Sequence, residues 1–252
     1  MQNMAFALDH VVIAVGDLDR AVADYQSLGF TVYPGGVHHG GVSHNALVVL
    51  ADGAYFEIIA YRQAAPDNRW WQVLTAAGEG IVDFAVLPEN TERDVEAARA
   101  RGLDVEGPIP GGRLRLDGVR LYWQIVRPAT TDLPFWCGDV TPRELRVPEG
   151  AIRRHANGVT GIATVRIVVA DLAVSIARFK ALAGPEAVSV FNGIPRIDLK
   201  GTVFELIGPD NDVARRHLAA RGEGVLSLDL RGSTPGAFDP KRLHGAELNV
   251  VA

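Results

Sequence analysis

Cysteine is almost absent from this chain of 252 residues, in which Cys137 is the single example. One cysteine cannot form a disulfide within a chain, and it cannot build a cysteine-based zinc site. The sequence also has no run of about 18 apolar residues, which a membrane-spanning helix requires. The first residues lack the basic segment that opens a signal peptide, so we expect a cytoplasmic protein.

Positive charge is also scarce, because 25 lysines and arginines face 30 aspartates and glutamates and leave a net charge of −5. A nucleic-acid-binding surface needs an excess of positive charge. We therefore expect no nucleic-acid partner and, without an apolar span, no membrane partner. Hydrophobic residues make up 48% of the chain, which is enough to build a sizeable core in one large or two small domains.

Two apolar segments each contain a single ionisable residue. Residues 8–15 form a β-branched run that contains His10 and is followed by Asp17, a residue suited to cap the next helix. Residues 54–60 have the pattern of a strand and contain Glu57. Buried strands rarely carry ionisable side chains without a partner or a metal ion. His10 and Glu57 are therefore the first candidates for a chemical site.

The elements of residues 8–60 follow the order strand, helix, strand, strand, strand, and residues 80–126 repeat this order. The last three strands of the second unit are expected at Val105, at 113–116 and at 119–126. Residues 162–207 repeat the order again, and a shortened unit follows from residue 222. This internal repeat predicts an α+β fold of four tandem βαβββ modules, the last one eroded, which form two paired half-barrel sheets.

The repeat also sets the expected domain boundaries. We expect the first pair of modules, with the candidate active site, in residues 1–127 and a proline-bearing connector in residues 128–160. The second, degenerate pair is expected in residues 161–252. The sequence leaves open whether the modules pair within one chain or between the subunits of a homodimer.

With the opening LDHVVIAV at residues 8–15, followed by Asp17 and Leu18, the chain resembles the vicinal oxygen chelate superfamily. That superfamily includes glyoxalase I, bleomycin-resistance proteins and extradiol dioxygenases. Residues 43–47 and 155–161 are similar to its glyoxalase-like domain branch. The resemblance implies a half-open barrel whose metal ligands come from the first and fourth strands of each module. It implies His10 and Glu57 as ligands of a divalent ion, Fe, Mn, Zn or Ni, that binds two vicinal oxygens of a substrate.

Only the first module keeps this pair of residues. A ligand bond to such an ion measures about 2.0–2.2 Å, so we expect the side chains of His10 and Glu57 to approach within about 5 Å. Their counterparts are Asp83 with Tyr122, Trp123 or Gln124 in the second module, Thr164 with Glu205 in the third, and Ser227 with Asn249 in the fourth. Asp83 is a candidate third metal ligand. We expect the second pair of modules to be scaffold that holds no metal ion.

His44 is a candidate catalytic residue at the mouth of the same concavity. If a tight turn pairs Leu50 with Tyr55, then Val48 lies opposite Glu57, and His44 shares the inward face. At about 3.3 Å per residue, His44 lies about 13 Å from Glu57, which is too far to share a metal ion. A register shifted by two residues would shorten this distance.

The metal-dependent interpretation predicts an enzyme that acts on a small oxygenated organic molecule, with His44 and Glu57 as catalytic residues. Its reaction would be that of a lyase or isomerase through an enolate, or a dioxygenation. Iron dioxygenases usually use two histidines and one carboxylate, which this chain supplies only if His44 or an unassigned histidine joins the pair. His38 and His39 fall in a glycine-rich loop and are expected to be solvated.

The expected substrate-binding residues are His44, Asn45, Trp123, Phe135 and Trp136. Aromatic side chains at these positions would line an apolar pocket for a small molecule. The alternative function belongs to a different class: a protein that holds no metal ion and sequesters a drug or metabolite, as bleomycin-resistance proteins do.

Overall fold

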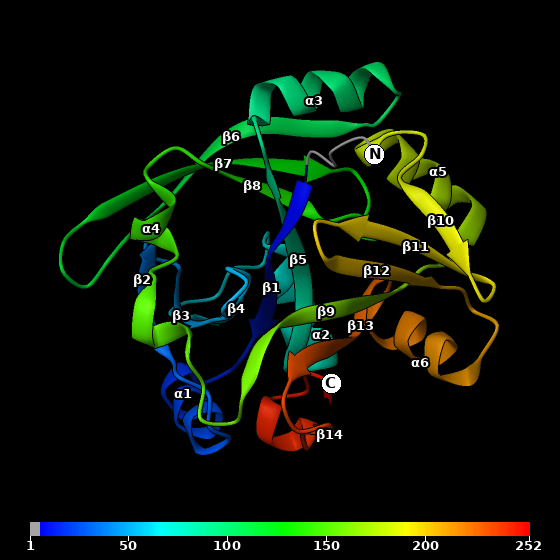
Figure 1. Ribbon diagram of the computed structural model, residues 1–252. Coiled ribbons are helices and arrows are strands. Elements are labelled where there is room, and N and C mark those ends of the chain that lie inside the picture. The colour runs from blue at the N-terminus through cyan, green and yellow to red at the C-terminus, as the bar shows by residue number, and fades with distance from the viewer. Residues whose placement is uncertain (1–5) are drawn as a thin grey trace.

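The computed structural model describes residues 6–252, and its first two modules form a closed barrel (Figure 1). The first module consists of β1 (Phe6–Ala14), α1 (Leu18–Ser27), β2 (Tyr33–His38), β3 (Ser43–Val49) and β4 (Tyr55–Tyr61). After α2 (Arg69–Ala77), the second consists of β5 (Gly80–Pro88), α3 (Thr91–Ala100), β6 (Val105–Leu114), β7 (Arg120–Pro128) and β8 (Phe135–Asp139). The strand order is β1-β4-β3-β2-β6-β7-β8-β5. The predicted α+β fold is confirmed, with a barrel that is closed rather than half-open.

The repeat is visible in how the helices of these two modules begin. Asp17 precedes α1 and Asn90 precedes α3. The side chain of each accepts a hydrogen bond from the backbone N–H three residues later, from Arg20 at 3.0 Å and from Arg93 at 2.9 Å. Such N-caps satisfy donors that the first helical turn leaves unpaired. The cap expected at Asp17 is confirmed.

The second module departs from the prediction in two strands. Residues 105–114 form one strand, β6, because the glycines and prolines in this stretch do not end its pairing with β7. β8 lies inside the expected connector, and it pairs with β5 through Phe135 and Trp136. The barrel therefore runs to Asp139 rather than ending at residue 127. A strand of five residues is too short to show a recognisable alternation of apolar and polar side chains.

The rest of the connector closes one end of the barrel. α4 (Arg143–Arg146) follows β8, and Val147 after it is fully buried in a cluster with inward-facing side chains of β3 and β4. His155 fastens the segment, because its Nδ1 accepts from the backbone N–H of Thr31 at 3.0 Å and its Nε2 donates to the carbonyl of Val49 at 3.1 Å. The part of the connector from α4 to His155 thus packs into the barrel end, and we call this segment the plug.

The second pair of modules forms an open sheet. Its elements are β9 (Val159–Val168), α5 (Leu172–Ala183), β10 (Val188–Phe191), β11 (Ile194–Leu199), β12 (Thr202–Ile207), α6 (Asp212–Arg221), β13 (Gly224–Gly232), β14 (Gly236–Ala237) and β15 (Leu248–Val251). The strand order is β10-β11-β12-β9-β13-β15-β14. Over residues 224–251 the fourth module contains a 3₁₀ turn but no α-helix, which agrees with its eroded repeat. Among residues 6–252, no helix is long and apolar enough to span a membrane.

The open sheet packs against the outside of the barrel. Phe84 on β5 and Phe204 on β12 have ring centroids 5.4 Å apart, and Phe179 on α5 lies 6.3 Å from Phe204. All three rings are fully buried in one apolar cluster that includes both sheets. Because this outer face of the barrel is covered, the inner face is the one available for a site.

We expect Phe204→Ala to lower the free energy of unfolding by about 3–5 kcal/mol, because it removes a buried ring and leaves a cavity between the sheets. The control is Leu116→Ala, whose side chain is 76% exposed and whose loss should change stability by at most about 0.5 kcal/mol. Urea denaturation measures both values. A loss below about 1 kcal/mol at Phe204 would show that the sheets do not share a core.

Candidate functional site

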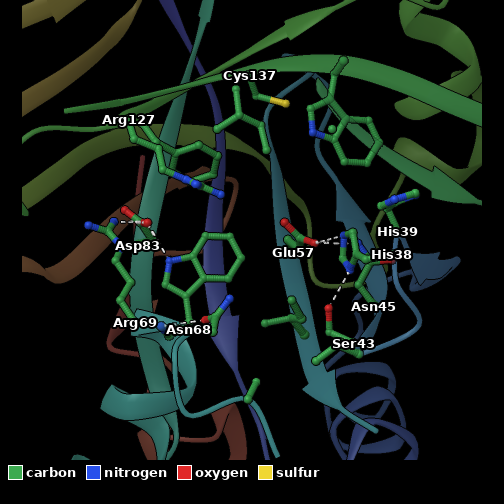
Figure 2. Close-up of a pocket in the computed structure, with 18 of the residues that line it drawn as sticks. His38, His39, Ser43, Asn45, Glu57, Asn68, Arg69, Asp83, Arg127 and Cys137 are labelled. Carbon is green, nitrogen blue, oxygen red and sulfur yellow. Dashed lines mark hydrogen bonds and ion pairs between the residues drawn. The ribbon is translucent and has the colours of Figure 1, made fainter. Parts of the chain in front are cut away.

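The barrel encloses a cavity of about 1130 Å³ (Figure 2). Its apolar lining includes Ile59, Trp70, Trp123, Ile125 and Phe135. Its polar lining includes His10, His38, Asn45, Glu57 and Arg113. Alternate residues of each barrel strand face the lumen, which brings together side chains that are distant in sequence. A cavity of this size and lining can hold a small organic molecule.

His10 and Glu57 meet inside this cavity. β1 and β4 are adjacent and parallel, with Val12 opposite Glu57. The Nε2 atom of His10 lies 3.3 Å from the Oε2 atom of Glu57, and both side chains are buried. The approach within about 5 Å that the sequence led us to expect is confirmed.

A β-bulge in β1 turns Asp9 toward His10. The register of β1 against β5 shifts between Leu8 and His10, which makes Asp9 the extra residue. A bulge re-aims the side chain of such a residue. The Oδ2 atom of Asp9 therefore accepts a hydrogen bond from His10 Nδ1 at 2.7 Å. This contact orients the imidazole with its Nε2 toward Glu57.

Two arginines of the plug helix α4 hold Asp9 in turn. Arg143 Nη1 donates to Asp9 Oδ1 at 2.6 Å, and Arg146 Nη1 donates to Asp9 Oδ2 at 2.8 Å. Arg146 Nη1 also donates to the hydroxyl of Tyr55 at 2.7 Å. Burial alone would raise the pKa of Asp9, but the two guanidinium groups outweigh burial and hold this pKa well below its usual value. Asp9 is therefore a buried anion that ties the plug to the site.

Glu57 has two further partners, His38 and Asn45. His38 Nε2 lies 3.2 Å from Glu57 Oε1, and Asn45 Nδ2 donates to the same oxygen at 2.6 Å. The sequence placed His38 in a solvated loop, whereas it is the last residue of β2 and its side chain is 20% exposed. Gly35 on β2 permits the close approach of the Asn45 side chain, because a Cβ atom at position 35 would lie 2.0 Å from Asn45 Oδ1. We call His10, His38, Asn45 and Glu57 the Glu57 cluster.

The charges in the cluster are coupled. Burial would raise the pKa of Glu57, but hydrogen bonds with His10 and His38 outweigh burial and hold this pKa well below its usual value. Burial would lower the pKa of His10, but its contacts with Asp9 and Glu57 outweigh burial and raise this pKa. Glu57 is therefore a buried carboxylate beside an imidazole that readily takes up a proton.

His44 faces away from the cavity, so its predicted position was wrong. The β3–β4 hairpin pairs Leu47 with Glu57, one residue away from the expected register. Residues 51–53 form a three-residue loop where a two-residue turn was expected, and the loop length sets the register. A shift of one residue turns every side chain of a strand to the opposite face. Asn45 rather than His44 therefore lines the cavity.

Asp83 also lines the cavity, but it lies across from Glu57 and has other partners (Figure 2). Its Oδ2 atom accepts a hydrogen bond from Trp70 Nε1 at 2.6 Å and forms an ion pair with Arg69. Its Oδ1 atom accepts from the backbone N–H of Phe84 at 2.9 Å. The structure therefore does not bring Asp83 together with the His10–Glu57 pair.

The fourth-strand position of the second module was also assigned wrongly. Ala85, the counterpart of Val12, lies opposite Phe135 of β8, so the counterpart of Glu57 is Phe135 and not a residue of β7. Phe135 and Trp123 line the cavity, and their part in substrate binding stays a prediction. Trp136 points the other way, and its fully buried ring packs 4.8 Å from that of Phe6 in the main core.

Glu205 is the third-module counterpart of Glu57, and it belongs to an ion-pair network. Its Oε2 atom lies 3.2 Å from Arg166 Nε, and its Oε1 atom pairs with Arg196. Arg166 also binds Asp229, with 2.5 Å between Nη2 and Oδ2. The same strand position therefore carries a carboxylate neutralised by arginines in one module and bonded to imidazoles in the other.

As the side chains stand, no three or more His, Cys, Asp or Glu residues among 6–252 enclose a position for a metal ion. His10 and His38 instead contact the carboxylate of Glu57 directly. The arrangement is a hydrogen-bonded cluster in which both carboxylate oxygens already have protein partners.

Comparisons with known proteins identify the kind of domain. Residues 8–183 match a family model described as a glyoxalase-like domain, and no curated protein matches the chain. A hypothetical protein from Staphylococcus aureus is 14% identical, with 98% of this chain and 99% of that chain covered and a TM-score of 0.76.

Two further solved structures share the fold. A mutant of 4-hydroxymandelate synthase from Streptomyces coelicolor is 14% identical, with 92% of this chain and 72% of that chain covered and a TM-score of 0.64. A fusion of a xylose isomerase-like TIM barrel with 4-hydroxyphenylpyruvate dioxygenase is 15% identical, with 90% of this chain but 37% of that chain covered and a TM-score of 0.57. At these identities the likeness shows a common fold alone.

We expect Asp9→Asn to lower the free energy of unfolding by about 3–5 kcal/mol, because it removes a fully buried carboxylate and leaves Asp139 as the remaining anionic partner of the buried guanidinium of Arg146. The control is Asp117→Asn, which removes a half-exposed partner of Arg115 and should cost at most about 1 kcal/mol. Guanidinium chloride denaturation measures both. Equal losses for the two variants would contradict the importance of Asp9.

Neighbouring residues of β3 test the register. Asn45→Ala removes the hydrogen bonds that Asn45 makes with Glu57 and Arg113, so it should cost about 1–3 kcal/mol of folding free energy. His44→Ala should change stability by no more than about 0.5 kcal/mol, because this side chain faces away from the cavity. Thermal or urea unfolding ranks the two variants, and the opposite ranking would restore the register expected from the sequence.

Proposed function

The chain belongs to the glyoxalase-like domain family of the vicinal oxygen chelate superfamily, and on this premise we propose that its barrel is the active site of a metal-dependent enzyme. The substrate would be a small oxygenated organic molecule that lies in the cavity with two neighbouring oxygens toward Glu57. The contact between His10 and Glu57 carries the proposal, because it places an imidazole and a carboxylate together in a cavity whose apolar lining includes Trp70, Trp123 and Phe135.

The residues present fit a divalent ion in their chemistry and spacing. Asp9 holds His10 Nδ1, as a carboxylate commonly does for a metal-binding histidine, and this leaves Nε2 toward Glu57. Two ligand atoms that each lie about 2.1 Å from one ion at a right angle are about 3.0 Å apart. The 3.3 Å between His10 Nε2 and Glu57 Oε2 is close to that spacing. Imidazole and carboxylate ligands suit Fe, Mn, Zn or Ni.

His10 and Glu57 would hold the ion, which would supply Lewis-acid stabilisation of the charge that develops on the substrate oxygens. Glu57 is kept in place by Asn45, whose Nδ2 donates to its Oε1 and whose own Oδ1 accepts from Arg113 Nη1 at 3.2 Å. Arg113 is 2% exposed, and its Nε has no hydrogen-bond partner within residues 6–252. This buried guanidinium adds positive potential to the cavity wall, where it would favour an oxyanion.

The aromatic lining would bind the apolar part of the substrate. Trp70 and Phe135 have ring centroids 5.7 Å apart, and Trp123 lies 6.3 Å from the ring of His38. These rings offer large apolar surfaces with little conformational freedom, and they restrict water around the polar cluster. An aromatic or otherwise flat organic molecule fits such walls better than a strongly hydrated one.

Two reaction classes follow from this arrangement. A lyase or isomerase would proceed through an enolate, whose developing negative charge the ion and the nearby guanidinium of Arg113 would stabilise. A dioxygenase would use the same chelation of neighbouring oxygens. The name of the fusion protein, 4-hydroxyphenylpyruvate dioxygenase, makes dioxygenation of aromatic substrates a reaction to assay alongside the first class.

One observation favours a second candidate function, which is binding of a small molecule without a metal ion. Both oxygens of Glu57 already accept hydrogen bonds from protein side chains, which satisfies a buried carboxylate without any ion. Such a protein would sequester a drug or metabolite in the aromatic part of the cavity.

Isothermal titration with Mn²⁺, Co²⁺, Ni²⁺ and Zn²⁺ separates the two functions. We expect wild type to bind one ion, and Glu57→Gln to weaken this binding by at least about 10–100-fold, since the loss of a ligand exceeds the effect of losing an outer partner. The matched control is Glu205→Gln, which changes the counterpart in the third module and should leave ion binding unchanged. Absence of ion binding to wild type, with retained binding of organic ligands, would favour the second function.

A further inference from the structure

We infer that the metal centre is completed by His38, so that all three protein ligands come from the first module. This inference rests on the proposed function and specifies its ligand set. It departs from the expectation that the second module of a pair supplies ligands from its own first and fourth strands.

The second module has no side chain free for this purpose at those two positions. Its fourth-strand position carries Phe135, which has no ligand atom. Its first-strand position carries Asp83, whose Oδ2 atom is bound by Trp70 and Arg69 (Figure 2). Removing Asp83 from these partners would leave a guanidinium and an indole N–H without their acceptor, which is unfavourable in a half-buried site.

His38, at the end of β2, is positioned to serve as the third ligand. Its Nε2 atom lies 3.2 Å from Glu57 Oε1, almost the same separation as the 3.3 Å between His10 Nε2 and Glu57 Oε2. Both values are near the distance of about 3 Å expected between two ligands of one ion. In Figure 2, His38 points toward Glu57 from the side of the cavity opposite Asp83.

The other ring nitrogen of His38 also has the partner that a metal-binding histidine needs. Nδ1 lies 3.0 Å from the hydroxyl of Ser43, which can accept or donate and therefore serves either tautomer of the ring. Asp9 plays the corresponding part for His10. Each imidazole is thus held at Nδ1 and presents Nε2 to the same carboxylate.

The three side chains would close on an ion by replacing their mutual contacts. Although no three such side chains in residues 6–252 enclose an ion as they stand, His38 is 20% exposed and ends its strand, so its ring has room to turn. The resulting set of two imidazoles and one carboxylate is the ligand set of non-haem iron(II) sites with open positions for substrate. The sequence-based expectation of one histidine and two carboxylates gives a different, oxygen-rich site.

The test is titration of wild type and three variants with Co²⁺, followed by calorimetry and by the visible absorption of the bound ion. His38→Ala should weaken binding by about 10–100-fold and change the absorption spectrum, because it removes a nitrogen ligand. His39→Ala is the matched control, since His39 is the next residue, lines the same cavity and should leave both readouts unchanged. Asp83→Asn should also leave both unchanged.

The outcomes separate this inference from the proposed function. If wild type binds Co²⁺ and Asp83→Asn, rather than His38→Ala, weakens binding, the ligand set is wrong while the metal-dependent function stands. If wild type binds no ion at all, the proposed function fails and the inference fails with it. Circular dichroism of each variant checks folding, and His38→Gln, which keeps a polar side chain, replaces His38→Ala if the latter does not fold.

Discussion

The buried carboxylate of Asp9 is the constraint on which the rest of the site depends. Charges removed from water cost several kcal/mol each unless partners of good geometry offset the loss. Asp9 obtains these partners from His10 and from Arg143 and Arg146 of the plug helix. The bulge in β1, the docking of α4 and the orientation of the imidazole all satisfy this one group. The docking of the connector and the orientation of His10 therefore depend on the same carboxylate.

The comparison of Glu57 with Glu205 shows how one position acquires different chemistry. Glu57 lies opposite Val12 in the parallel pairing of β1 with β4, and Glu205 lies opposite Arg166 in the corresponding pairing of β9 with β12. A guanidinium at the opposite position neutralises the carboxylate directly. A valine there cannot, so Glu57 depends on imidazoles and an amide from elsewhere in the barrel. Imidazoles exchange protons and bind metal ions, whereas guanidinium groups do neither.

The sequence predicted those features of the fold that depend on local signals. The helix cap at Asp17, the repeat of modules and the closeness of His10 to Glu57 follow from short motifs and from strand order. The register of the β3–β4 hairpin could not be predicted, because loops of two and three residues are both common in hairpins and differ little in sequence. That small choice decided whether His44 or Asn45 entered the cavity.

The extent of β2, which places His38 in the barrel, could not be predicted for a different reason. The stretch before His38 contains Pro34, Gly35 and Gly36, a composition typical of a turn. It forms a strand because β3 and β6, one of them distant in sequence, supply hydrogen-bond partners on both sides. Strand formation of this kind depends on tertiary context more than on the residues of the strand. Local sequence patterns therefore did not predict the position of His38, although His38 contacts the carboxylate of Glu57.

Stability alone does not explain the burial of charge behind His10. Apolar residues of similar volume would fill the end of the barrel at lower cost, because replacement of a buried ion pair by well-packed hydrophobic side chains is often neutral or stabilising. The plug nevertheless places Arg146, which is 2% exposed, against Asp9 behind His10. The arginines of the second sheet, Arg166 and Arg196, have side chains about 30% exposed, so water shares the cost of their charge. Within residues 6–252, the arginine–carboxylate pair with the lowest exposure of both side chains, Arg146 with Asp9, supports the imidazole of His10, which indicates that the orientation of His10 is what this arrangement secures.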